Sequence, residues 1–242
     1  MGKIFTRVMP TMPASIQTAA YANTEILFDW YKVADFKGSN IDSIKVIVKG
    51  TNGAAQTMVG IDLFFATSEI ATSEDDARLF HQNVSVNQTP TTLGTTGAAV
   101  DTPGWFNNLV GYVPIAAGDF NDADLIYLNI ANKDLSGMEI PVSGDLYVAA
   151  VSKGALDFRG TVVCDDEQAI TQSTLTVKTT SALINFAPGD VLYDEDDRLI
   201  GMVKTVNSAT EMTMTTNLVN ATVDGKDLYD LSPIQLILSG DK

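Results

Sequence analysis

The chain has little cysteine, histidine or positive charge, and each shortage excludes a class of site. A single cysteine, Cys164, excludes a disulfide within the chain and a zinc site built from several cysteines. A single histidine, His81, excludes any site that needs two histidines of one chain. Lys and Arg number 15 against 30 Asp and Glu, which gives 242 residues a formal net charge of -15. Because nucleic acids and anionic membrane surfaces are bound through clustered Lys and Arg, we expect neither as the main partner.

Long hydrophobic runs and catalytic motifs are also missing. No stretch of 18 apolar residues occurs, so we predict no transmembrane helix. Near the start, Thr6, Arg7, Pro10 and Pro13 interrupt the apolar residues, so we predict no secretory signal. The sequence contains no G-x-S-x-G, no P-loop and no G-x-G-x-x-G. Paired carboxylates can act as acid and base, but among 30 of them the sequence selects no pair. We therefore expect no enzyme activity and no cofactor.

What the sequence does contain is typical of an all-β protein. The acidic residues comprise 23 Asp and only 7 Glu, and the chain holds 18 Gly. Asp favours turns and helix caps, whereas Glu is a good helix former. The composition therefore predicts many short strands joined by turns.

We expect residues 1–22 to form an N-terminal arm. We expect residues 23–153 to form a β-sandwich of jelly-roll or immunoglobulin-like type. The arm has two prolines and no regular period. Beyond it, Ile26, Phe28 and Trp30 alternate with other residues, which predicts a strand with these three on its core face. Further strands are expected at 44–48, 59–66, 109–116, 124–131 and 145–151. The first two of these flank Asn52-Gly53, which predicts a β-hairpin, and residues 68–80 are the best candidate for a helix.

Residues 154–242 predict a small β-barrel that follows the sandwich. Six short strands are expected, at 158–164, 174–179, 190–193, 198–206, 210–216 and 234–239. Asp194–Asp197 and Asn207-Ser208 provide turns between consecutive strands of this set.

Two acidic segments are the candidates for metal ligands. The segment Asp119–Asp124 resembles the start of an EF-hand loop, but Ala123 and Asp124 occupy positions that require an oxygen ligand and a glycine. Asp194–Asp197 places four carboxylates in one turn, which fits a solvated hairpin turn or a loose Ca²⁺ site. We favour the solvated turn and predict no metal site. Cys164 lies in an apolar run and is expected to be a buried structural thiol.

Two groups of apolar residues are candidates for partner binding. In the arm, Ile4, Phe5, Val8 and Met9 are expected to dock on a neighbouring subunit. The alternative is that the arm folds back on its own sandwich as an edge strand. The second group is Trp105 with Phe106, which follow Pro103-Gly104. This pair would stack on a sugar ring, insert into a partner, or close one end of the sandwich.

The C-terminal part of the sequence resembles a known group of proteins. The resemblance rests on four segments: Gly160-Thr161-Val162, the run Phe186–Tyr193 (FAPGDVLY), Leu199–Val203 (LIGMV), and Val206–Thr210 followed by alternating Met212 and Met214. These phrases resemble a small β module of the virion structural proteins of tailed bacteriophages. The stretch covers about a quarter of the chain.

The resemblance implies a non-enzymatic role on the capsid surface. It implies a decoration protein that binds the major capsid protein and copies of itself as a homo-oligomer. The acidic net charge fits the outside of a particle better than a surface that faces packaged DNA. The alternatives are a head or tail fibre component and a glycan-binding module for host attachment, with Trp105 as its stacking platform.

Overall fold

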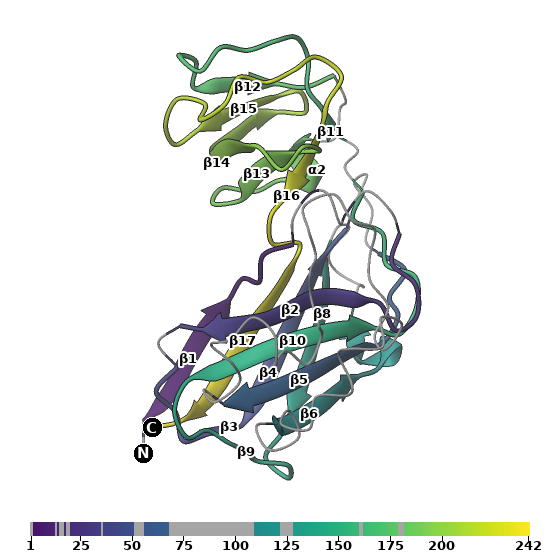
Figure 1. Ribbon diagram of the computed structural model, residues 1–242, viewed down its shortest axis with the longest axis vertical. Helices are drawn as coiled ribbons and strands as arrows, with labels where there is room; N and C mark the ends of the chain where they lie inside the picture. Colours follow the sequence, from purple (N-terminus) through teal and green to yellow (C-terminus); the bar gives the residue numbers. More distant parts are fainter. Residues whose placement is uncertain are drawn as a thin grey trace, which may run out of the picture.

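The computed structural model describes residues 2–12, 14, 17, 20–34, 36–50, 56–67, 109–121, 128–159, 162–178 and 182–242. The protein is all-β, with antiparallel pairing throughout the described strands, as the composition predicts. Figure 1 shows two lobes. The large lobe contains the described residues up to 159 and residues 233–242, and the small lobe contains the described residues from 162 to 230.

The large lobe contains a five-stranded sheet in the order β1-β17-β4-β8-β7. Its strands are β1 (Lys3–Val8), β17 (Ile234–Asp241), β4 (Ser43–Lys49), β8 (Leu128–Asp134) and β7 (Phe120–Asn121). In β4, buried Ile44, Val46 and Val48 alternate with more exposed residues, so a period of two gives this sheet one core face and one outer face. β1 near the start of the chain pairs with β17 near its end. The two chain ends therefore lie side by side (Figure 1).

A four-stranded sheet in the order β2-β10-β5-β6 forms the other layer of the large lobe. Its strands are β2 (Ile26–Val33), β10 (Leu146–Ser152), β5 (Ile61–Thr67) and β6 (Leu109–Ile115). A short pair, β3 (Asn40–Ile41) with β9 (Ile140–Pro141), and a 3-10 turn, η2 (Ala117–Asp119), complete the described elements. The two sheets share one hydrophobic core, to which Val46, Phe65 and Leu236 belong.

The small lobe is a six-stranded sheet in the order β11-β16-β13-β14-β15-β12. Its elements are β11 (Val162–Val163), β12 (Thr174–Thr176), α2 (Ala182–Asn185), β13 (Val191–Asp194), β14 (Leu199–Ser208), β15 (Glu211–Met214) and β16 (Asp227–Asp230). A second core, separate from that of the large lobe, is formed by residues such as Leu192, Ile200 and Met212. β13 pairs with β14 and β14 pairs with β15, so both predicted hairpins are present. The predicted turn at 194–197 joins the first pair, whereas the second pair turns at Ala209-Thr210, because Asn207 and Ser208 still belong to β14.

The pairing of strands differs from the sequence prediction in three places. The hairpin across Asn52-Gly53 is wrong, because β4 and β5 belong to different sheets. The segment 234–239 is not a strand of the small lobe, because β17 lies between β1 and β4 in the large lobe. The separate arm does not hold for residues 3–8, which form β1 of the chain's own sheet. In each case an apolar strand has the same pattern whichever sheet it joins, so only the tertiary structure decides its neighbours.

Candidate functional site

The two lobes meet at an ion triad. Lys49 ends β4 of the large lobe, Asp190 precedes β13, and Asp230 ends β16. The Lys49 Nζ lies 2.6 Å from Asp190 Oδ1 and 2.5 Å from Asp230 Oδ2. All three side chains are largely buried, with exposed fractions of 14% for Lys49, 7% for Asp190 and 8% for Asp230. A lysine of one lobe thus holds two carboxylates of the other.

Backbone donors satisfy the remaining oxygens of the triad. Ala187 N–H donates to Asp190 Oδ2 over 2.8 Å, and Ser232 N–H donates to Asp230 Oδ1 over 3.0 Å. Burial raises the pKa of Asp190, and the nearby charge of Asp230 raises it further. Burial works to lower the pKa of Lys49, but the charges of Asp230 and Asp190 outweigh it and raise the pKa. One cation therefore faces two buried carboxylates, which is why the second carboxylate is costly to ionise.

Beside the triad, a cavity of about 230 Å³ lies between the lobes. Its lining includes Ile47, Lys49 and Gln235 from the large lobe and Phe186, Pro188 and Asp190 from the small lobe. Ligand pockets usually measure 300–1,000 Å³, so this space is small for a cofactor. We interpret it as a gap in the junction of the lobes.

Four residues predicted to bind a partner lie on or next to β1. Ile4, Phe5 and Val8 belong to the strand, and Met9 follows it directly. Val8 is buried in the core of the large lobe, and Ile4 and Met9 are half-buried. Phe5 is different, because 72% of its surface is exposed. Among the described residues, β1 pairs with β17 along one edge and with no strand along the other. Of the four predicted residues, Phe5 is thus the one available to a partner.

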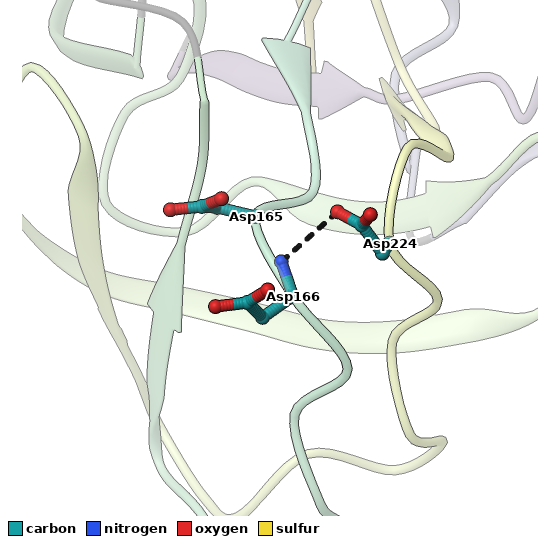
Figure 2. A group of neighbouring side chains, drawn as sticks. All are labelled: Asp165, Asp166 and Asp224. Atoms are coloured by element: carbon teal, nitrogen blue, oxygen red, sulfur yellow. Dashed lines mark hydrogen bonds between the residues drawn. The ribbon is translucent and has the colours of Figure 1, made fainter.

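An acidic cluster lies in the small lobe (Figure 2). It brings together Asp165, Asp166 and Asp224, with one carboxylate oxygen of each within 4.8 Å of the others. Asp224 Oδ1 accepts a hydrogen bond from Asp166 N–H over 3.2 Å and lies 2.5 Å from Lys178 Nζ. The hydrogen bond from Lys178 lowers the pKa of Asp224. Lys178 therefore already balances part of the negative charge of the cluster.

In the acidic turn 194–197, backbone and side-chain N–H groups of the chain itself donate to the carboxylate of Asp194. Asp194 has 1% of its side chain exposed. Its Oδ1 accepts from Asp196 N–H at 3.1 Å and Arg198 N–H at 3.0 Å, and its Oδ2 accepts from Arg198 Nε at 2.8 Å. Asp194 thus acts as the internal acceptor of the hairpin turn. In the other segment, Asp119 pairs with Lys133 over 2.9 Å, while Asp122 and Asp124 lie outside the described residues.

Other predicted residues have varied outcomes. Cys164 is buried in the core of the small lobe, as expected, and burial raises its pKa to about 12. His81, Trp105, Phe106 and the predicted helix at 68–80 lie outside the described residues. Sequence reasoning missed the triad entirely. Its one local signal is the Gly189-Asp190 turn, where Gly189 has a φ of 95°, and that signal gives no hint of Lys49.

Comparison of the sequence with protein-family models and with curated proteins found no similar protein. Among the described residues, no helix has the length and apolar character needed to cross a membrane.

Proposed function

We propose that the protein is a non-enzymatic structural protein of a tailed-bacteriophage virion. Its role is that of a decoration protein, which binds the major capsid protein at the capsid surface in many copies. The single observation that carries a binding role is the exposed Phe5 on β1, a strand that has no neighbour along one edge among the described strands. Edge strands with exposed apolar side chains are surfaces on which other proteins dock.

Two further observations support a place on the outside of a particle. The net charge of -15 opposes close contact with packaged DNA. The FAPGDVLY and LIGMV phrases that carry the resemblance lie around β13 and β14 of the small lobe. We infer that the large lobe is a β-sandwich and that the small lobe is a barrel-like module inserted between β10 and β17. Such an insertion leaves the large lobe to contact a capsid while the small lobe projects from it.

The experiment is reconstitution on capsids. Purified protein is added to capsids that lack it, and the particles are imaged by electron cryomicroscopy. The proposal predicts regular density over the capsid surface with hundreds of copies per particle. Density at a single vertex or along the tail would instead support a fibre component, and the absence of any bound density would refute a capsid-surface role. A glycan array, probed with the same protein, tests the glycan-binding alternative.

A further inference from the structure

Within the part of the chain that the structure describes, no strand pairs with the open edge of β1, and the register shows which backbone groups face it. Lys242 N–H donates to Gly2 C=O over 3.0 Å, and the register pairs Lys3 with Asp241 and Ile4 with Gly240. In an antiparallel pair, residues that exchange hydrogen bonds alternate with residues that do not. The backbone groups of Gly2, Ile4, Thr6 and Val8 therefore face β17. Those of Lys3, Phe5 and Arg7 point away from it, toward the open edge.

The side chains of the same three residues lie on the outer face of the sheet. Successive side chains of a strand alternate between its faces, and Val8 is in the core, so Lys3, Phe5 and Arg7 point outward. The register places Arg7 beside Ile237 and Ile237 beside Lys45, which makes one row of cation, isoleucine and cation across three strands. The outer face thus combines apolar side chains with positive charge.

The charges of this row are not balanced within the described chain. Arg7 donates from its Nε and Nη2 to Gln235 Oε1, a neutral acceptor. No described carboxylate lies within 4 Å of Arg7 or Lys45, although the protein as a whole is strongly acidic. Lys3, by contrast, pairs with Asp42 and Asp241. Arg7 lies on the edge strand and also lines the cavity between the lobes, whereas Lys45 lies two strands away from the open edge. A carboxylate supplied from outside along that edge therefore complements Arg7.

We propose that β1 accepts an extended segment of a partner protein as an added strand. Opposite Phe5 the segment presents an apolar side chain, and two positions away, opposite Arg7, it presents an acidic one. The backbone groups of Lys3, Phe5 and Arg7 pair with the segment, while Phe5 and Arg7 select its side chains. This inference names the partner chemistry of the surface used in the proposed function and rests on that function only for the identity of the partner.

The test uses short peptides and the full-length protein, without capsids. The probe is a fluorescently labelled Thr-Asp-Thr-Ile-Thr-Asp-Thr peptide, with Val and Phe versions at its centre, measured by anisotropy at low ionic strength. One control peptide carries Lys in place of Asp, and another is N-methylated at the central residue. We expect saturable binding of the acidic set with a Kd of about 1 mM or tighter. We expect at least fivefold weaker binding of both controls, because one reverses the charge and the other removes a ladder donor.

Variants of the protein locate the contact. Arg7→Glu should weaken binding of the acidic peptide at least fivefold, and Phe5→Pro should abolish it, since Pro removes a donor that faces the open edge. Lys204→Glu, which makes the same charge change at an exposed residue of β14 in the small lobe, is the matched control and should leave binding unchanged. Melting curves identify any variant that fails to fold, and N-methylation of the peptide then provides the evidence on the backbone pairing.

Two results would overturn the inference. One is that no peptide of the acidic set binds better than the Lys-containing set. The other is that Arg7→Glu and Lys204→Glu weaken binding equally, which would indicate a response to net charge alone. Neither result bears on capsid reconstitution, so failure of this inference and failure of the proposed function remain distinguishable.

Discussion

At the scale of single residues, Lys49 is the side chain on which the junction of the lobes depends. It contacts Asp190 and Asp230, both buried, and the carboxylates lack any other cation in the described ion pairs. Breaking a buried ion pair from one side is costly, because a charge remains buried without its partner. Replacing all members of such a group by neutral residues is far less costly.

The first prediction follows from this asymmetry. Lys49→Met should lower the free energy of unfolding by about 3–5 kcal/mol, because two carboxylates are left facing each other. Adding Asp190→Asn and Asp230→Asn in the same chain should recover most of that loss. Urea unfolding of the three proteins measures both effects. Equal stability of wild type and Lys49→Met would show that the triad does not hold the lobes.

The second prediction concerns pH. The pKa of Asp190 is raised in the folded protein above its ordinary value of 3.8, first by burial and then by Asp230. Between 3.8 and the raised value, the folded protein binds a proton that the unfolded chain does not, so stability rises as the pH falls through this window. Wild type should therefore gain stability relative to Asp190→Asn when the pH falls from about 7 to about 4.

Asp224→Asn is the matched control for this measurement. Lys178 lowers the pKa of Asp224, so its contribution to stability is present above 3.8 and is lost only as the pH falls below that value. The stability difference between wild type and this control should stay flat over the same pH range. A flat difference for Asp190→Asn as well would contradict the assigned shift.

At the scale of elements, β1 combines a structural face with an exposed one. Val8 contributes to the core, whereas Phe5 is 72% exposed three residues earlier. The strand therefore stabilises the sheet through one face and one edge, and it leaves the other face and edge for contacts outside the chain.

The third prediction separates these two roles. Val8→Ala should lower the free energy of unfolding by about 2 kcal/mol, because it removes two buried methyl groups and leaves a cavity. Phe5→Ala, on the same strand, should change it by less than about 0.5 kcal/mol. Thermal or urea unfolding compares the two variants. A large loss for Phe5→Ala would mean that this ring packs within the chain.

At the scale of the whole molecule, the small lobe is inserted into the large one. The chain leaves the large lobe after residue 159 and returns at β17, while β11 and β16, near the two ends of the insertion, pair with each other. Each lobe has its own core. An insertion whose ends are adjacent and whose core is separate has the features of a unit that folds alone.

The fourth prediction tests this independence. A fragment of residues 160–232 should unfold cooperatively, with the strand-rich circular dichroism of the small lobe. Its Asp190 and Asp230 lose Lys49 but become accessible to water, so the burial cost disappears with the partner. A fragment without a cooperative transition would show that the small lobe needs the large one to fold.

Local patterns determined much of the fold from the sequence alone. The period of two in Ser43–Lys49 and the turn at 194–197 correctly predict a strand and a hairpin, because neighbouring residues carry all the information. The hairpin predicted around 207–208 is also present, but its turn lies two residues later, at Ala209-Thr210. The predicted core face of β2 is wrong, because it does not depend on neighbouring residues alone. Register shifts against β10 put Phe28 in the main core, while Ile26 and Trp30 belong to a separate cluster. An irregularity of this kind changes which side chains share a face, and it arises from the partner strand.

Only the tertiary structure decided which distant segments meet. The composition established an all-β protein, but β17 shows the same alternation whether it joins the small lobe or completes the large one. The triad is the extreme case, since Lys49 and Asp230 are 181 residues apart and nothing near either residue points to the other. The physical reason is that side-chain pattern specifies which face of a strand is buried, whereas the choice of neighbour depends on how all the strands pack together.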